Sequence, residues 1–360
     1  MKIAYIIDTL EVGGAERVAV DLANLMSNNG HEIAIIVFKD KGSLKKALHK
    51  NIVFFNLERN NKLSLVTMLK FYQYIKNFDI VHVHMRHVLK YVMSVKWIFH
   101  FDAKIVFHDH YGKVGIDKKV PFFLGIVLKQ TDAYVGVDRQ LCHWALQEVG
   151  IDKNKIWNLP NIIVPQFLSK NLYKASKKTK DTVDLVLVSN FKREKNIEFA
   201  ITIMKILNNS NNRRYRLTVF GKIIDKNYFN EILVLINRYQ IQNSIEVITD
   251  CDTIQKHLHN YHLALHTAIS ESGPLVLMEY LAHGLPFVSY HTGEVVAKIE
   301  VELPELIMHN WNELEWVDKI NTILSPDSKI DTVSLRQLFQ KYFSPEEYVK
   351  QCNIIYNEIY

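Results

Sequence analysis

The feature that most constrains the fold of this chain is an alternation of short apolar runs with longer amphipathic segments. The runs in the first half are rich in Ile, Val, Phe and Tyr and nearly continuous; they are Lys2–Leu10, Glu32–Lys39, Ile52–Leu57, Ile80–His84, Lys104–His108 and Ala133–Val137. Continuous apolar runs are typical of parallel strands that helices cover on both faces. The pattern therefore predicts a doubly wound α/β sheet.

The same alternation restarts in the second half and predicts another such sheet. Its expected strands are Leu185–Ser189, Leu217–Phe220, Ile245–Ile248, Leu263–His266 and Phe287–Tyr290. The helices expected between them are Ile197–Leu207, Tyr228–Tyr239, Thr253–His259 and Leu275–His283. Helices at Ser334–Tyr342 and Pro345–Ile359 then close the chain without a following strand.

A polar stretch, Ser169–Asp184, separates the two patterns and is interpreted as an interdomain linker. Its charge comes from Lys170, Lys174, Lys177, Lys178 and Lys180. We predict a Rossmann-like N-terminal domain at 1–165, a Rossmann-like C-terminal domain at 166–342, and a helix at 343–360 that can pack back on the first domain. Because ligands of open α/β sheets bind beyond the carboxyl ends of the strands, the chemistry is expected on strand-to-helix loops that face a cleft.

Composition narrows the class of partner. The 44 Lys and Arg exceed the 38 Asp and Glu by 6, which permits a nucleotide or an acidic membrane face but is too mild for a nucleic-acid-binding protein. The cysteines are three in number, far apart and without C-x-x-C spacing, so we expect neither disulfides nor a cysteine zinc site. The N-terminal apolar run ends at Asp8, too early for a signal peptide, and a cytoplasmic protein is expected.

The first candidate loop follows the first predicted strand and contains Gly13 and Gly14. Adjacent glycines let backbone N–H groups approach a phosphate or sugar at a helix N-terminus. The third glycine of the dinucleotide-binding fingerprint is missing. A purely structural tight turn explains the pair equally well.

The second loop, Ser189–Asn196, opens the predicted C-terminal domain. Lys195 can neutralise a diphosphate as a point charge and Arg193 as a bidentate fork. A solvated basic loop is the alternative, and for any single lysine it is the commoner outcome.

The third loop carries the strongest signal, with Glu271 before a helix and Glu279 inside it. The free N–H groups at Leu275 and Val276, in the first turn of that helix, point back toward the loop. One carboxylate can face a sugar and the other can bind ribose hydroxyls, with a diphosphate at the helix end between them. Glycine and proline around the pair make the spacing informative.

Histidines gather in the first half, at His82 and His84 on one strand and at His108 and His110 after another. Zinc binding is conceivable for such residues. Histidines in an apolar wall of parallel strands are more often core residues, and no helical H-E-x-x-H is present, so we expect no metal site. His108, at a strand's carboxyl end, is instead expected to point into the cleft.

Together the motifs resemble the retaining nucleotide-sugar glycosyltransferases of the GT-B fold, and within them glycosyltransferase family 4, the group 1 glycosyl transferases. The matching pieces occur in the family's order across nearly the whole chain. They are V-G-G-A-E-R-V-A-V-D-L-A near the N-terminus, F-D-I-V-H-V-H at 78–84, V-F-H-D at 106–109, L-P-N-I-I-V at 159–164, S-N-F-K-R-E-K-N at 189–196 and S-E-S-G-P-L-V-L-M-E-Y-L-A-H-G-L-P at 270–286.

The resemblance implies a role for each matching residue. Glu271 would hold hydroxyls of the donor sugar, Glu279 the ribose and Lys195 the diphosphate. His108 looks like the family's cleft histidine beside the transferred sugar. The glycine pair at 13–14 would close over the donor phosphates, and the helix end at 273–276 would face them.

The chain departs from the family pattern in places. Asn190 stands where many relatives carry the arginine of a Gly-Arg pair, so one phosphate-binding charge is absent or supplied by Arg193. Gly273-Pro274 replaces a common Gly-Phe-Gly run, and the proline deletes one N–H. Asp138 stands where a serine is frequent.

By this resemblance the chain is expected to be a metal-independent retaining hexosyltransferase without a cofactor. The donor would be a nucleotide sugar, with UDP favoured over GDP, and the acceptor a glycan or lipid-linked saccharide in polysaccharide or glycolipid biosynthesis. The segment Lys113–Lys129 mixes lysines with Phe122 and Phe123, and either lies on an anionic membrane at its inner face or forms a basic-edged core helix.

Two other functions compete. One is a non-catalytic GT-B subunit that binds or regulates a transferase complex, for which Asn190 and Pro274 are the support. The other is an epimerase or hydrolase on the same architecture, which would need a further carboxylate or histidine set that we do not find.

Overall fold

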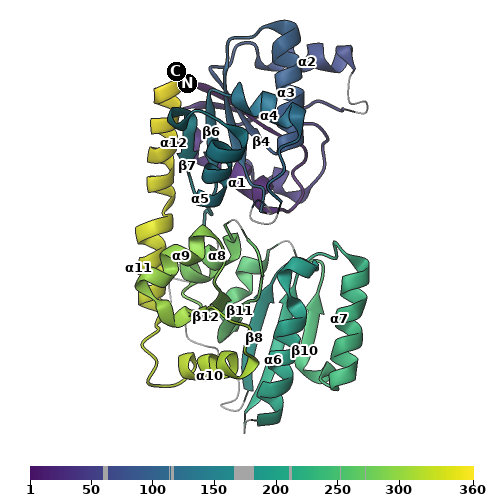
Figure 1. Cartoon of the computed structure of the whole chain (residues 1–360), viewed down its shortest axis with the longest axis vertical. Helices are drawn as coiled ribbons and strands as arrows, with labels where there is room; N and C mark the ends of the chain where they lie inside the picture. Colours follow the sequence, from purple (N-terminus) through teal and green to yellow (C-terminus); the bar gives the residue numbers. More distant parts are fainter. Residues whose placement is uncertain are drawn as a thin grey trace. The chain divides into compact units, whose positions relative to one another are not determined.

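The computed structural model describes residues 1–59, 64–112, 114, 117–165, 182–210, 213–251, 253–271 and 273–360. The chain divides into two compact units, shown in Figure 1: unit 1 is Met1–Val164 with Ser344–Tyr360, and unit 2 is Pro165–Phe343. The domains expected from the sequence were 1–165, 166–342 and 343–360. Most of the lysine-rich linker, residues 166–181, lies outside the described residues.

The described residues of unit 1 form a seven-stranded parallel sheet in the order β3-β2-β1-β4-β5-β6-β7. The strands are β1 (Lys2–Ile7), β2 (Glu32–Val37), β3 (Val53–Asn56), β4 (Ile80–His84), β5 (Lys104–Asp109), β6 (Ala133–Gly136) and β7 (Ile156–Asn158). Strand β7 was not predicted. The order reverses between β1 and β4, which is the switch point where ligands of such sheets bind.

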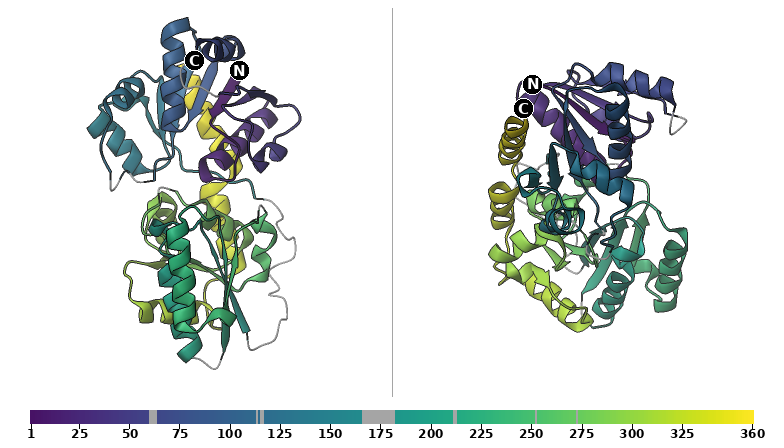
Figure 2. Two further views of the ribbon diagram at one scale, coloured as in Figure 1. Left: turned by 90° about the vertical axis from the view of Figure 1, so that its right-hand side faces the viewer. Right: turned by 45° about the horizontal axis from the view of Figure 1, so that its top comes forward.

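Helices cover both faces of this sheet. They are α1 (Gly14–Asn28), α2 (Leu65–Ile75), α3 (Arg86–Phe99), α4 (Phe122–Lys129), α5 (Arg139–Trp144, continued by a π turn at Ala145–Val149) and α12 (Pro345–Ile359). One core joins the sheet to α2, α3, α4 and α5. Helices α1 and α12 contact each other over the opposite face, where Tyr5 of β1 meets Tyr356 of α12 (Figures 1 and 2).

The described residues of unit 2 form a six-stranded parallel sheet in the order β10-β9-β8-β11-β12-β13. The strands are β8 (Thr182–Val188), β9 (Arg214–Phe220), β10 (Ile245–Ile248), β11 (Leu263–His266), β12 (Phe287–Tyr290) and β13 (Ile307–Met308). The switch point lies between β8 and β11, so the loops that leave these two strands are adjacent at the carboxyl edge.

The helices of unit 2 are α6 (Ile197–Ser210), α7 (Lys226–Tyr239), α8 (Leu275–His283), α9 (Gly293–Glu302), α10 (Glu313–Ile323) and α11 (Thr332–Phe343). Helix α6 packs between α7 and α10, and α8 packs against α9 and α11. The helix predicted over Thr253–His259 is wrong: two 3-10 turns, Ile254–Lys256 and Leu258–Asn260, stand there. The doubly wound α/β architecture predicted for both halves is confirmed.

The C-terminal helix α12 belongs to unit 1 although the chain reaches it through unit 2. Ser344 caps it by accepting the Glu347 N–H, and Pro345 occupies its first position, where no backbone donor is needed. Both chain termini lie at the same end of unit 1 (Figures 1 and 2). Among the described helices, none is both long and apolar enough to cross a bilayer.

Candidate functional site

The candidate site in unit 2 is built around an ion pair between Lys195 and Glu271. Lys195 ends the loop after β8 and Glu271 lies in the loop after β11, so the pair joins the two strands that flank the switch point. Both side chains are largely buried, at 17% and 23% exposure. Burial alone would raise the pKa of Glu271, but the charge of Lys195 and the adjacent His266 lower it to about 2. The carboxylate is therefore ionised at neutral pH.

Backbone contacts hold the two loops together. The Thr267 hydroxyl donates to the Lys195 carbonyl at 3.0 Å, and the Ile269 N–H donates to the Glu194 carbonyl at 2.9 Å. On the other side, the Glu271 N–H donates to the Thr292 hydroxyl at 3.0 Å, directly before α9. The position of the ion pair is thus set by hydrogen bonds from three loops.

His266, the last residue of β11, adjoins the pair and was not singled out from the sequence. The Ser289 hydroxyl donates to the Tyr290 carbonyl at 3.0 Å, so its oxygen accepts a hydrogen bond from His266 Nδ1, which lies 2.9 Å away. The other nitrogen, Nε2, is buried 3.9 Å from Glu271 Oε1 and has no hydrogen-bond partner among the described residues.

Glu279 lies within α8 and is 3% exposed. Its Oε1 accepts a hydrogen bond from Gln255 Nε2 at 3.0 Å, and Gln255 is itself buried in the 3-10 turn before β11. Gln255 is a second polar residue that the sequence did not reveal, because the contact joins segments that become neighbours only through packing. Helix α8 begins at Leu275, so the N–H groups of Leu275 and Val276 lie in its first turn, after buried Gly273 and Pro274.

The remaining basic-loop candidates point elsewhere. The Arg193 guanidinium is 60% exposed and pairs with Glu231 of α7 at 2.5 Å, so the structure does not bring it to the Lys195–Glu271 pair. The Asn190 side chain accepts the Lys222 N–H at 3.0 Å and ties the loop after β8 to the loop after β9. Both side chains therefore have protein partners in this structure.

In unit 1 the expected glycine loop leads into α1. Gly13 is the N-cap and Gly14 the first helical residue. A Cβ built on Gly13 would lie 2.3 Å from Glu16 Oε2, so the Glu16 carboxylate already sits against this helix start. Across the unit 1 switch point, His87 Nε2 lies 3.5 Å from Asp8 Oδ2.

The structure places His108 inside unit 1 rather than at an exposed strand end. Its ring is 0% exposed, stacks on that of His110 at a centroid distance of 4.3 Å, and meets the tilted rings of His82 and His84 at 5.4 and 5.3 Å. His110, the residue after β5, is the partly exposed one. The sequence analysis placed His108 at the carboxyl end of a strand but did not anticipate that α1 and α12 pack over that face of the sheet.

A buried ion pair closes the carboxyl edge of β5. Asp109, 2% exposed, accepts from Arg86 Nη2 at 2.7 Å and from the Tyr134 hydroxyl at 2.9 Å. The guanidinium of Arg86 lies 4.1 Å from the ring centre of Tyr111 and 4.3 Å from that of Trp144. Beside it is a cavity of about 400 Å³, lined by Val114, Lys118, Arg139, Gln140, His143, Trp144 and Glu148.

Asp138, the unexplained departure, has a structural role. Its carboxylate accepts the Leu141 N–H at 2.7 Å and caps α5. Aspartate and serine are both favoured helix caps, so the exchange keeps the function of the position.

Comparison with known proteins now identifies the fold family. The model of glycosyltransferase family 4 matches residues 12–167 and that of the glycosyl transferases group 1 matches residues 169–337. The chain is 20% identical to the amylovoran biosynthesis glycosyltransferase AmsD of Erwinia amylovora over 99% of each chain. It is 24% identical to the N-acetyl-alpha-D-glucosaminyl L-malate synthase of Bacillus anthracis, over 83% of this chain and 79% of that protein.

Solved structures agree on the fold. HepE of Anabaena in complex with UDP-glucose matches with a TM-score of 0.83 at 15% identity, covering 99% of this chain and 100% of HepE. Together the family models span almost the whole chain, one in each half. The chain is a member of the group 1 glycosyltransferases and has the GT-B fold.

Proposed function

We propose that this glycosyltransferase is a retaining hexosyltransferase that uses a nucleoside diphosphate sugar, with UDP favoured over GDP. The observation that carries the proposal is the Lys195–Glu271 pair at the β8/β11 switch point of unit 2. HepE has been solved in complex with UDP and with UDP-glucose, which supports the choice of donor.

Lys195 is the residue we assign to the donor diphosphate. Glu271 holds its ammonium group in place before the donor arrives, which limits the reorganisation needed when phosphate oxygens bind. As the sugar–phosphate bond breaks, negative charge develops on the departing diphosphate. A fixed cation and the first-turn N–H groups of α8 stabilise that charge without a metal ion, so we propose metal-independent catalysis with no cofactor.

Glu271 is assigned to the transferred sugar as a hydrogen-bond acceptor. With a pKa of about 2 it carries no proton to donate at neutral pH, so general acid catalysis does not suit it. An ionised carboxylate does suit sugar hydroxyls, and its charge favours an oxocarbenium-like transition state. His266 Nε2 is a further polar atom beside it.

Glu279 is assigned to the ribose hydroxyls. Gln255 donates to one of its oxygens and so orients the carboxylate. The glycine pair Gly13-Gly14 remains a candidate for contact with the donor phosphates, and such contact requires the Glu16 carboxylate to leave Gly13, since two anions repel each other.

We place the acceptor on unit 1 and propose a glycan or lipid-linked saccharide in polysaccharide or glycolipid biosynthesis. The similarity to AmsD, an amylovoran biosynthesis glycosyltransferase, supports this choice. The cavity beside Trp144 combines an aromatic ring with polar groups, which suits a saccharide. Phe122 is 85% exposed, and Phe123 stacks edge-on against half-exposed Trp97, so α4 can contact an anionic membrane at its cytoplasmic face. Residues Lys113, Gly115 and Ile116 of that segment lie outside the described residues.

A non-catalytic role is not favoured, because both glutamates and Lys195 keep partners that orient them. The reaction is tested by incubating the protein with UDP-, GDP- and ADP-sugars and an oligosaccharide acceptor pool, with the product anomer read by NMR. The proposal expects turnover with one nucleotide class, undiminished by a chelator, and the donor's own anomeric configuration in the product. An inverted product, or slow hydrolysis alone with every donor, contradicts it.

A further inference from the structure

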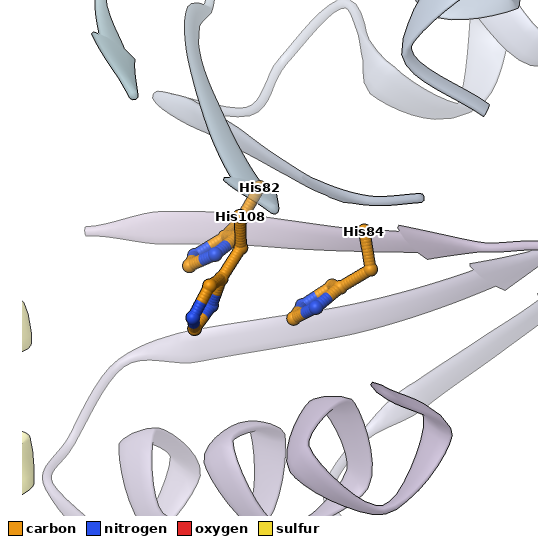
Figure 3. Close-up of side chains that lie close together, drawn as sticks. All are labelled: His82, His84 and His108. Atoms are coloured by element: carbon orange, nitrogen blue, oxygen red, sulfur yellow. The ribbon is translucent and has the colours of Figure 1, made fainter. Parts of the chain in front are cut away.

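The side chains of unit 1 that the proposed reaction does not use include three histidines on one face of the sheet. His82 and His84 are two residues apart on β4, and His84 pairs in register with His108 on β5. Figure 3 shows the three rings projecting to the same side of the sheet. One ring nitrogen from each lies within 4.8 Å of the others.

These rings are buried without enough hydrogen bonds. Their exposed fractions are 1%, 0% and 0%. Nε2 of His82, Nε2 of His84 and both nitrogens of His108 have no partner among the described residues. The Leu159 carbonyl lies near the His108 ring but completes no hydrogen bond of normal geometry. Buried polar atoms are normally satisfied, so this cluster calls for an occupant.

Hydrogen bonds that run from His84 Nδ1 through the ring of His110 fix the tautomer of His84. His110 Nδ1 lies 3.2 Å from Asn161 Oδ1, an acceptor, so it carries the proton and leaves His110 Nε2 as an acceptor. That atom lies 3.0 Å from His84 Nδ1, which must therefore donate. The consequence is a lone pair on His84 Nε2, directed into the cluster.

His82 has an equivalent outer contact. Its Nδ1 lies 2.7 Å from the Tyr356 hydroxyl, which is 3.0 Å from the Tyr5 hydroxyl. When Nδ1 donates to Tyr356, Nε2 is also a lone pair. Histidine ligands of metals characteristically make such a hydrogen bond through the nitrogen that does not bind the metal.

We propose that His82, His84 and His108 together bind one divalent transition-metal ion, for which Zn²⁺ is the best candidate. Neutral imidazoles are preferred zinc ligands. Burial lowers the pKa of each ring, which keeps all three in that neutral form. The three nitrogens lie within 4.8 Å of one another, so modest side-chain rotations would bring each to the Zn–N distance of about 2.0–2.1 Å from a shared ion.

The role of the ion is structural. It joins β4 to β5, and through His82 and Tyr356 it fastens α12 to the sheet of unit 1. The site shares no residue with the donor site assigned in unit 2, so it stands independently of the proposed reaction. It also explains why His108 is buried: it is a ligand and not a sugar contact.

The test uses the full-length chain, produced in zinc-supplemented medium because a buried ion is acquired during folding. After desalting, metal content is measured by mass spectrometry. We expect about one zinc per chain in the wild type and less than about 0.1 in His84→Gln. The control is His309→Gln, which disrupts the surface group of His291, His309 and Glu300 and leaves the three buried histidines unchanged. It is expected to keep its zinc.

X-ray absorption on the wild-type zinc protein gives a second measurement that needs no variant. Three imidazole ligands at about 2.0–2.1 Å are expected. A wild type without zinc overturns the proposal; buried water would then fill the cluster. Zinc that is lost in His309→Gln and kept in His84→Gln overturns it too, as does an absorption spectrum with fewer than three imidazole ligands. Should His84→Gln not fold, the absorption spectrum still decides.

Discussion

The two units carry the same kind of sheet, yet their carboxyl edges hold ion pairs of opposite character. In unit 1, Arg86 and Asp109 are enclosed by aromatic rings, and Asp109 accepts further hydrogen bonds from Tyr134 and from the Tyr111 N–H. In unit 2, Lys195 and Glu271 pair with each other, and the buried Nε2 of His266, which has no hydrogen-bond partner among the described residues, lies beside them. Both sheets thus present a carboxyl edge, and the edge at which we propose donor binding is the one whose ion pair has fewer hydrogen-bond partners.

The largest effect is expected where the enclosed pair is broken. Arg86→Met leaves the Asp109 carboxylate buried and unpaired, which should cost about 3–5 kcal/mol of unfolding free energy. Urea denaturation measures the loss. UDP affinity of the folded protein should stay within about twofold, since unit 2 is untouched. Full stability with lost UDP binding would reverse the roles assigned to the two pairs.

Breaking the other pair should affect turnover. Lys195→Met removes the cation assigned to the departing diphosphate, so kcat/KM for the donor should fall about 10²–10³-fold. Steady-state kinetics measure this. Lys205→Met, which removes a surface lysine that lies over the Tyr239 ring, is the matched control and should change the rate by less than about twofold. Near-normal turnover in Lys195→Met would eliminate unit 2's pair as the donor site.

The pH dependence of stability should reveal the same pair. The pKa of Glu271 falls from an ordinary 4.5 to about 2 on folding, so the pair stabilises the protein above pH 4.5 and loses this contribution as the pH falls toward 2. The unfolding free energy of wild type minus that of Glu271→Gln should be on the order of 2 kcal/mol, constant from pH 5 to 8, and should shrink below that range. A difference that grows on acidification would contradict the assignment.

A smaller effect is expected from the residue that orients Glu279. Gln255→Leu removes one hydrogen bond to a buried carboxylate, so the donor KM should rise about tenfold with kcat changed by less than about threefold. Gln242→Leu, whose amide reaches Asn237 at the surface, is the control. A fall in kcat at constant KM would place Gln255 nearer the reacting bond than the ribose.

The smallest effect is expected at Arg193, which the sequence assigned to the diphosphate. Its guanidinium pairs with Glu231 in an exposed position. Arg193→Gln should therefore change donor KM by less than about threefold. A loss comparable to that of Lys195→Met would show that the arginine swings to the donor and replaces the missing family arginine.

The sequence predicted some elements to the residue and missed others for physical reasons. The strand Leu263–His266 and the helix Leu275–His283 are mostly apolar segments, and their bounds match the structure. Strands β7 and β13, of 3 and 2 residues, are too short to show a period. The segment Thr253–His259 has helix-like composition, yet it folds as two 3-10 turns.

The candidate site shows the same division. Lys195 and Glu271 follow predicted strands, and the topology brings two such loops together, so their pairing could be expected from the sequence. Gln255 and His266 could not be found this way, because their partners come from other segments through packing. The sequence did contain one usable signal for His266, a polar residue at the end of an apolar strand, as in L-A-L-H at 263–266.

The central claim, that nucleotide binds at the unit 2 pair and not at the unit 1 pair, is tested most directly by calorimetric titration of UDP into wild type, Lys195→Met and Arg86→Met. The account predicts at least about tenfold weaker binding in Lys195→Met and wild-type affinity in folded Arg86→Met. Equal affinity in Lys195→Met and wild type, or loss confined to Arg86→Met, would contradict it.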